Sequence, residues 1–142
     1  MLISNRMSQN VSPLRLLLID DDEINNFVAE EWIKAQADNI SFISFVNVED
    51  ALQHLRSCTR EVYPDLILCD LKMPMYTGFE FIELYEHEFY PEHPDTRLVV
   101  LSSSLRKQDV EQAKSYGSVS EFVAKQSVQE NFDSILRKYL TP

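Results

Sequence analysis

Hydrophobic and polar positions along the chain alternate between two patterns. Short continuous apolar runs bounded by turn residues are typical of buried strands, whereas apolar residues spaced three or four apart are typical of helices. Apolar runs predict five strands, at residues 14–19, 40–46, 65–70, 97–101 and 121–124. Each predicted strand is followed by a segment with helical spacing. The five predicted helices are at residues 23–37, at a segment that starts at 47, at a segment that starts near 78 and ends before Pro91, at residues 107–116 and at residues 127–139.

Two of the predicted helices also carry start signals. Asn47 precedes two acidic residues and is expected to be an N-cap, and Ser127 with Glu130 forms a capping box. The fourth helix is mostly polar, and Gly117 is expected to end it. The other helices carry apolar stripes, namely Ile24, Phe27, Val28 and Ala35; Val48, Ala51, Leu52 and Leu55; Phe79, Ile82, Tyr85 and Phe89; and Val128, Phe132, Ile135, Leu136 and Tyr139.

The strict alternation of strands and helices predicts an α/β fold. Right-handed crossovers place helices on both faces of a single parallel sheet. We expect five strands in the order 2-1-3-4-5, which is a flavodoxin-like three-layer (βα)5 sandwich. The topological switch point of such a sheet lies between its first and third strands, and ligands bind there at the carboxyl ends.

Acidic residues follow the two strands that meet at this switch point. Asp20, Asp21 and Asp22 follow the first strand, and Asp70 ends the third. Because these strand ends share an edge, we expect Asp20, Asp21 and Asp70 to converge. Converging carboxylates repel one another unless a hard cation such as Mg²⁺ binds them. An acid after a strand is also often only the solvated start of a loop, and Asp22 and Glu23 are expected to be helix-start acids.

Composition and charge narrow the class of protein. The 142 residues suit one domain, which we place at residues 14–142 after a flexible leader at 1–13 that lacks the apolar core of a signal peptide. The net charge of −10 argues against nucleic acid and anionic membranes as partners. No apolar segment approaches the roughly 18 residues of a membrane span. Cys58 and Cys69 form no disulfide framework, which favours a reducing, cytoplasmic compartment.

Five motif elements occur in order along the chain, each at the carboxyl end of a predicted strand. They are the acidic pair Asp20-Asp21, Asp70, the turn Met73-Pro74 with Gly78, Ser102 and Lys125. No single element is specific, but the ordered set is. Over about residues 14–139 the chain resembles the receiver domain of two-component response regulators.

The resemblance implies a role for each of these residues. Asp70 would be the phosphoacceptor, while Ser102 would hydrogen-bond a phosphoryl oxygen and Lys125 would pair with another oxygen and with Asp70. Asp20, Asp21 and Asp70 would bind Mg²⁺ together with the backbone carbonyl of Lys72. Ser102 and Phe122 would form the switch that reports phosphorylation.

The resemblance also implies the partners. The phosphoryl donor would be a sensor histidine kinase or a histidine phosphotransfer protein, and a downstream protein target would read the phosphorylated state. The protein would not be an enzyme, although it assists its own phosphorylation and dephosphorylation. Because residue 142 follows closely on the fifth predicted helix, we expect a stand-alone receiver.

Three features depart from the family pattern. After the fifth strand, the chain has Lys125-Gln126 where the family usually has Lys-Pro. The segment from Gly117 to Lys125 is one residue longer than usual, which predicts a bulge or an altered loop. The aromatic switch position is Phe122, where tyrosine is also common. These departures concern the geometry of the switch more than the chemistry of phosphorylation.

Two other functions fit parts of the sequence. A haloacid-dehalogenase-like phosphatase would use Asp20-x-Asp22 with Ser102 and Lys125, but it needs a late acidic pair, and only Glu130 and Asp133 follow, both in the fifth helix. A pseudo-receiver would bind partners without phosphate, although every residue that the chemistry requires is present. Turnover of a phosphomonoester would indicate the phosphatase, and a failure of phosphorylation would indicate the pseudo-receiver.

Overall fold

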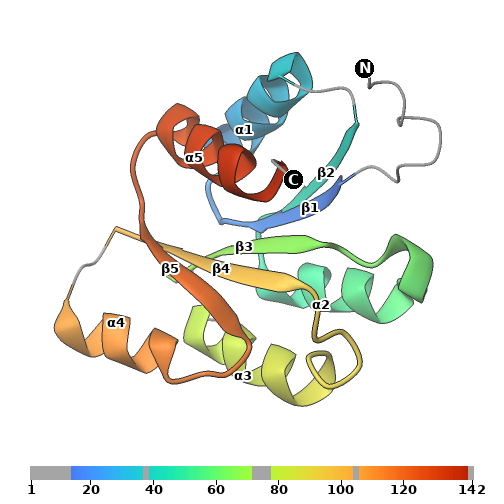
Figure 1. Ribbon diagram of the computed structural model, residues 1–142, viewed down its shortest axis with the longest axis vertical. Helices are drawn as coiled ribbons and strands as arrows, with labels where there is room; N and C mark the ends of the chain where they lie inside the picture. The colour runs from blue at the N-terminus through green and yellow to red at the C-terminus, as the bar shows by residue number, and fades with distance from the viewer. Residues whose placement is uncertain (1–13, 37–38, 72–77, 104–105, 141–142) are drawn as a thin grey trace.

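The structure is a computed structural model that describes residues 14–36, 39–71, 78–103 and 106–140. Strands and helices alternate along the chain (Figure 1). The strands are β1 (Leu14–Ile19), β2 (Ile40–Phe45), β3 (Leu66–Asp70), β4 (Arg97–Ser102) and β5 (Val119–Ala124). The helices are α1 (Glu23–Gln36), α2 (Val48–Ser57), α3 (Gly78–Glu88), α4 (Lys107–Lys114) and α5 (Val128–Leu140), with a short 3₁₀ turn at Arg60–Val62.

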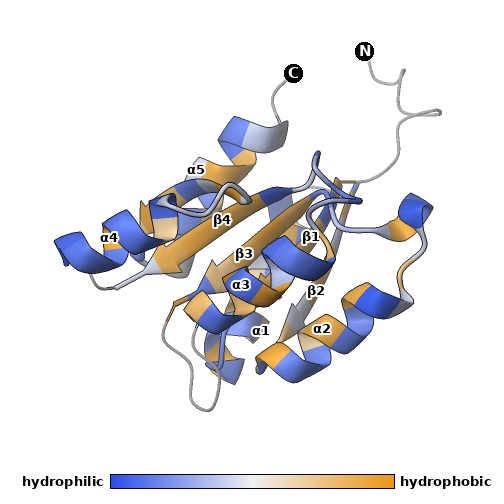
Figure 2. Cartoon of the chain, turned by 90° about the horizontal axis from the view of Figure 1, so that it is seen from below, coloured by the Kyte–Doolittle hydropathy of each residue, from blue (hydrophilic) through white to orange (hydrophobic). Residues whose placement is uncertain are grey.

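The sheet confirms the predicted topology. Its five strands are parallel and lie in the order β2-β1-β3-β4-β5. Helices α1 and α5 cover one face, and α2, α3 and α4 cover the other (Figure 1). Figure 2 shows the hydrophobic strands enclosed between helices whose outer surfaces are largely hydrophilic. The chain is therefore the three-layer (βα)5 sandwich expected from the sequence.

The central strands are buried on both faces because successive side chains point to opposite sides of the sheet. In β1, Leu17 and Ile19 belong to the core beneath α2 and α3, whereas Leu16 and Leu18 belong to the core beneath α1 and α5. The five residues of β3 are all buried. Such strands read as continuous apolar runs, which is why the sequence revealed them.

The apolar stripe predicted for α1 is wrong, because a different face of the helix is buried. Ile24, Phe27 and Val28 are 77%, 62% and 46% exposed, and Ala35 is also exposed, whereas the buried positions are Asn26, Ala29 and Ile33. The small Ala29 side chain suits close packing against the sheet, and Asn26 is buried because its amide donates to the Asp20 carbonyl. The helix ends at residue 36, and residue 37 lies outside the described residues.

The predicted helix starts are confirmed at α2, α3 and α5. Asn47 Oδ1 accepts from the Asp50 N–H at 2.7 Å, and Ser127 Oγ accepts from the Glu130 N–H at 3.2 Å while donating to Glu130 Oε1 at 2.9 Å. Gly78 begins α3 as expected. The buried positions of the predicted stripes of α2, α3 and α5 are Val48, Ala51, Leu52, Leu55, Ile82, Tyr85, Phe89, Phe132, Ile135 and Leu136.

Several predicted boundaries differ from the observed ones. Strand β2 is one residue shorter at its end, β3 starts one residue later, β4 extends to Ser102, and β5 begins at Val119. Helix α4 stops at Lys114, where the Ser115 N–H donates back to the Glu111 carbonyl, so Gly117 does not end the helix. The mostly polar sequence of α4 offered no apolar stripe from which to place its end.

The extra residue expected before Lys125 forms a bulge in β5. Leu98 pairs with Val119 but Val99 pairs with Glu121, so Ser120 has no counterpart in β4. A bulge restores the pairing of the following residues after an insertion. Ser102 therefore faces Ala124, and the chain leaves the sheet at Lys125.

The two cysteines are free, and Cys69 is buried in β3, where burial raises the pKa of its thiol. The structure thus agrees with the expectation that they form no disulfide. Among the described helices, none has both the length and the apolar character that a membrane crossing requires.

Gly78 is required by a close approach of two backbone segments. Its N–H donates to the Leu71 carbonyl at 2.8 Å, and a Cβ atom at this position would lie 2.6 Å from both the Asp70 carbonyl oxygen and Leu71 Cα. We predict that Gly78→Ala lowers the free energy of unfolding by about 1–3 kcal/mol, because backbone must move to admit the methyl group. Urea denaturation measures this loss. Gly117→Ala is the matched control, since a Cβ atom there would meet only Glu86 Oε1, at 4.0 Å. Equal losses in the two variants would contradict the prediction.

Candidate functional site

The carboxyl ends of β1 and β3 bring the predicted acidic residues together. The strands pair directly, with Ile19 opposite Cys69, so Asp20 and Asp70 emerge side by side. One carboxylate oxygen from each of Asp20, Asp21 and Asp70 lies within 4.8 Å of the others. Asp20 and Asp70 are buried, and Asp21 is exposed. The predicted convergence of the three carboxylates is confirmed.

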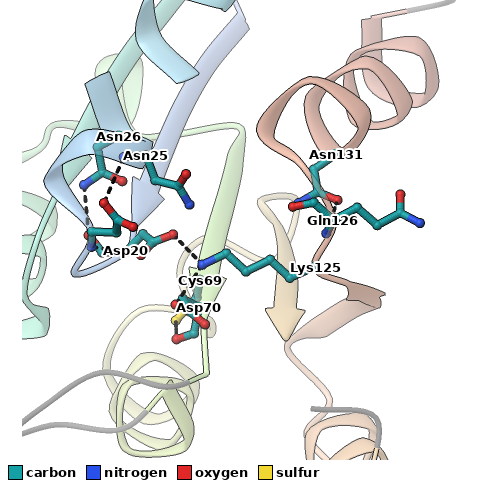
Figure 3. Close-up of polar contacts among 9 residues, drawn as sticks. Asp20, Asn25, Asn26, Cys69, Asp70, Lys125, Gln126 and Asn131 are labelled. Atoms are coloured by element: carbon teal, nitrogen blue, oxygen red, sulfur yellow. Dashed lines mark hydrogen bonds and ion pairs between the residues drawn. The ribbon is translucent and has the colours of Figure 1, made fainter. Parts of the chain in front are cut away.

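Lys125 reaches this cluster from the end of β5 (Figure 3). Its ammonium nitrogen donates to Asp20 Oδ2 at 2.8 Å and to Asp70 Oδ2 at 3.1 Å. Only 3% of the Asp20 side chain and 8% of the Asp70 side chain are exposed, so these are largely desolvated ion pairs. Such pairs hold their geometry because separating them would leave a buried charge without compensation.

The electrostatics of the cluster keep Lys125 charged. Burial lowers the pKa of Lys125, but the hydrogen bond to Asp20 and the charges of Asp70 and Asp20 outweigh burial and raise it above its ordinary value of 10.5. The stabilisation that the ammonium contributes is therefore present at neutral pH and is lost only as pH rises through the raised pKa.

The loop after β1 holds Asp20 in place. Asp20 Oδ1 accepts from the Asp22 N–H at 3.0 Å, and the Asp20 carbonyl accepts from Asn26 Nδ2 at 2.9 Å. Asp22 Oδ1 accepts from the Asn25 N–H at 3.0 Å, so Asp22 is a helix-start acid, as expected. It is not part of the carboxylate cluster.

Of the remaining predicted site residues, the structure describes Ser102 and Phe122. Ser102 is buried at the end of β4, and its carbonyl accepts from the Lys125 N–H at 2.7 Å. Phe122 is partly buried and packs against the core beneath α2 and α3. The Met73-Pro74 turn and Lys72, the predicted metal ligand, lie outside the described residues.

Sequence reasoning missed two buried asparagines beside the site. Asn26 is 4% exposed, and its Oδ1 atom has no hydrogen-bond partner among the described residues, while Asn131 is 4% exposed and contacts the backbone of Gln126. The sequence carried one signal for Asn26, because residues 26, 29 and 33 have helical spacing. Nothing in the sequence indicated the contact between Asn131 and Gln126.

The donor set fits a hard divalent cation. Mg²⁺ prefers carboxylate oxygens and retains several waters, and here two buried carboxylates adjoin one exposed carboxylate. Binding would have to displace the Lys125 ammonium from part of this cluster or share the carboxylates with it. The same arrangement places a carboxylate oxygen of Asp70 3.1 Å from the Lys125 ammonium.

A family model for the response regulator receiver domain matches residues 16–137. The chain belongs to this family. The match covers every motif residue discussed above and stops within α5, so the two-component signalling role of receivers applies to nearly the whole chain.

Curated relatives agree with this assignment. The receiver is 29% identical over 126 residues to the two-component response regulator ORR41 of Oryza sativa, covering 89% of this chain and 94% of that protein. It is 25% identical over 122 residues to the transcriptional regulatory protein MctR of Rhizobium johnstonii, covering 86% of this chain. The receiver spans only about half of MctR, 53% of its length.

Solved structures share the fold. The receiver aligns with a two-component response regulator from Cytophaga hutchinsonii with a TM-score of 0.73 and 28% identity, covering 92% of this chain and 98% of that one. The phosphorylated cyanobacterial phytochrome response regulator RcpA gives a TM-score of 0.77 at 20% identity, with coverage of 92% and 96%. TrrA from Thermotoga maritima, in complex with Mg²⁺ and BeF, gives a TM-score of 0.64 at 20% identity, covering 87% of this chain and 96% of that one.

Proposed function

We propose that this receiver accepts a phosphoryl group onto Asp70 from a phosphohistidine and thereby switches its contacts with other proteins. The observation that supports this most directly is the position of the Asp70 carboxylate. It is buried, it lies 3.1 Å from the Lys125 ammonium, and it adjoins two further carboxylates that suit a divalent cation. Phosphoryl transfer requires an in-line nucleophile and neutralisation of charge, with little other chemistry.

In the proposed reaction, a carboxylate oxygen of Asp70 forms a bond to phosphorus. The bond between phosphorus and the histidine nitrogen breaks, and its electron pair returns to the imidazole, which leaves as the neutral ring once its other nitrogen carries a proton. The product on the receiver is an acyl phosphate. Lys125 would remain close to Asp70 and pair with a phosphoryl oxygen, while Ser102 would hydrogen-bond another.

We infer that the cation is Mg²⁺, held by Asp20, Asp21 and Asp70, with the carbonyl of Lys72 as a further expected ligand. When bound, a divalent cation supplies positive charge that offsets the charge of the phosphoryl oxygens. The TrrA complex supports this choice, because that receiver fold was obtained with Mg²⁺ and BeF. We place the protein in the cytoplasm, which suits its free cysteines and a kinase-linked partner.

The output of the proposed reaction is a change in protein contacts. Movement of Ser102 toward the phosphoryl group would shift a pre-existing two-state equilibrium of the receiver, and Phe122 would follow. By family resemblance, we expect the readout surface on α4, β5 and α5, where a downstream protein would bind.

The rival functions are less well supported by the same geometry. In the phosphatase, Asp22 would serve the reacting site, whereas its carboxylate caps α1. The pseudo-receiver gives the converging carboxylates and Lys125 a structural role only, and no chemical one. We therefore propose that the protein is a phosphoacceptor that assists its own phosphorylation and dephosphorylation, not an enzyme.

Incubation with acetyl phosphate and Mg²⁺, followed by intact mass spectrometry, tests this function. We expect a gain of one phosphoryl group that is absent when EDTA replaces Mg²⁺. A parallel assay with a generic phosphomonoester should show no turnover. Turnover would support the phosphatase, and a failure of both acetyl phosphate and phosphohistidine donors to label the protein would support the pseudo-receiver.

An exposed apolar patch on α1 supports a protein as the phosphoryl donor. It consists of Ile24, Phe27 and Val28, which are the α1 side chains exposed despite their large apolar surfaces. Helix α1 begins three residues after Asp20, so the patch borders the acidic edge of the sheet. A protein that presents a phosphohistidine to Asp70 would cover this end of α1, and the patch would then be buried.

We predict that Phe27→Ser slows phosphoryl transfer from a phosphorylated histidine phosphotransfer protein by roughly tenfold or more, since truncating an aromatic anchor in an interface costs about 2 kcal/mol. The rate with acetyl phosphate should not change, because that donor needs no docking surface. Glu31→Ser, at an exposed polar position of the same helix, is the matched control. Equal slowing with both donors would show that Phe27 acts on the site itself and not on docking.

A further inference from the structure

The residue after Lys125 is held by a side chain from the next helix. Asn131 Oδ1 accepts from the Gln126 N–H at 3.1 Å, and Asn131 Nδ2 donates to the Gln126 carbonyl at 3.4 Å. One amide side chain therefore binds both polar groups of one backbone residue (Figure 3). This contact is available because residue 126 is not proline and therefore carries a backbone N–H. A proline at this position, which is usual in receivers, has no N–H to donate.

Asn131 is well placed to hold this loop rigidly. It is 4% exposed, and it lies in the first turn of α5, where its own N–H donates to the Ser127 carbonyl at 3.0 Å. A buried amide that loses its partners pays the cost of desolvation without compensation, so the contact persists. The side chain of Gln126, in contrast, is exposed, and the contact uses only its backbone.

Lys125 is consequently fixed on both sides. Its own N–H donates to the Ser102 carbonyl at the end of β4, at 2.7 Å, and the following residue is bound by Asn131. A lysine side chain has a flexible four-carbon stem, so the place that its ammonium can reach depends on the position of the backbone that carries it. Holding the backbone at residues 125 and 126 therefore directs the ammonium between Asp20 and Asp70, where it is observed.

We propose that Asn131 is a positioning residue for phosphoryl acceptance at Asp70, acting through the Gln126 backbone on Lys125. This rests on the proposed function of Asp70. Asn131 touches neither the reacting atoms nor the carboxylates. Its two hydrogen bonds restrain the backbone of Gln126, at the position where the family pattern usually has proline.

The first test is the rate of phosphorylation by acetyl phosphate at saturating Mg²⁺. Asn131→Ala should lower the rate constant roughly tenfold, since small misplacements of a catalytic group cost one to two orders of magnitude. Gln126→Ala is the matched control and should match the wild type, because it keeps the backbone N–H and carbonyl that Asn131 binds. A normal rate in Asn131→Ala would overturn the proposal.

A double-mutant cycle separates positioning from general damage to the fold. If Asn131 acts through Lys125, then Asn131→Ala in a Lys125→Ala background should change the rate by less than about twofold, because the group that it positions is already gone. A further tenfold loss in that background would show that Asn131 acts by another route, and would overturn the proposal.

Chemical footprinting of lysines gives a readout that does not depend on phosphorylation. With a lysine-acylating reagent and peptide mass spectrometry, Lys125 in the wild type should react at least tenfold more slowly than the exposed Lys107. Asn131→Ala should raise the reactivity of Lys125 several-fold and leave that of Lys107 unchanged. If the protein takes up no phosphate but this change occurs, the proposed function fails while the positioning contact stands. An unchanged footprint would overturn the contact's role.

Discussion

Replacement of Asp70 by asparagine is expected to abolish phosphoryl uptake, with at least a hundredfold loss of rate. The amide cannot serve as the carboxylate nucleophile. Among the described carboxylates, Asp20 is the other one that is buried and paired with Lys125, but its Oδ1 already accepts from the Asp22 N–H and its Oδ2 from Lys125. Uptake of phosphate from acetyl phosphate with Mg²⁺, followed by intact mass, measures the loss.

The folded state should survive this change. The substitution would remove one negative charge from a cluster of three carboxylates, and Lys125 would still pair with Asp20 at 2.8 Å. We therefore expect no decrease in the urea midpoint of Asp70→Asn. Asp22→Asn is the matched control, because asparagine caps a helix as well as aspartate does and Asp22 lies outside the cluster. Normal phosphoryl uptake in Asp70→Asn would contradict the assignment of Asp70 as the phosphoacceptor. Loss of phosphoryl uptake in Asp22→Asn would favour the phosphatase.

Replacement of Lys125 by methionine is expected to have the largest effect on stability. The buried carboxylates of Asp20 and Asp70 would lose the ammonium that pairs with both of them. Removing one partner of a buried ion pair in this way costs about 3–5 kcal/mol. We predict a loss of that size in urea denaturation with EDTA present. Mg²⁺ should recover more stability in Lys125→Met than in the wild type, because the cation would no longer compete with an ammonium group.

The control for this variant is a lysine in a surface ion pair. Lys138 donates to Glu121 Oε1 at 2.8 Å, but its side chain is 59% exposed. Surface pairs contribute about 0–1 kcal/mol, so Lys138→Met should have little effect on stability in either buffer. If Lys125→Met were as stable as the wild type in EDTA, the ion pairs at the sheet edge would not be the structural element that we describe.

The sequence predicted the sheet and the meeting of its carboxylates because both depend on local patterns and a general rule of topology. Strand β3 is apolar up to its final aspartate, and a parallel sheet wound in the order 2-1-3-4-5 necessarily brings the ends of β1 and β3 together. Asp20 and Asp70 could therefore be placed side by side from the sequence. The caps at Asn47 and Ser127 were predictable for the same reason, since each involves residues only three apart.

The buried face of α1 could not be predicted from hydrophobicity. Asn26 is buried because it meets the Asp20 carbonyl, a contact that exists only once the loop after β1 has folded. Its burial turns Ile24 and Phe27 toward solvent, against their apolar character. A polar residue in a buried stripe and apolar residues outside it mark a surface shaped for function rather than for packing alone.

The contact between Asn131 and Gln126 was also beyond sequence reasoning. The absence of proline after Lys125 was visible in the sequence, but what replaces it was not. The replacement joins the start of α5 to the loop before it through a side chain whose partners are backbone atoms. Backbone groups carry no sequence signal, so only the structure reveals such a contact.

The central claim is that Asp70 becomes an acyl phosphate, and borohydride trapping tests it most directly. Borohydride reduces an aspartyl phosphate to homoserine, which tandem mass spectrometry of peptides can locate. After treatment with acetyl phosphate and Mg²⁺, we predict homoserine at position 70 and at no other aspartate, with none in the EDTA control. Homoserine at position 20 or 21, or a phosphoryl group that resists borohydride and maps to a serine, would contradict the account.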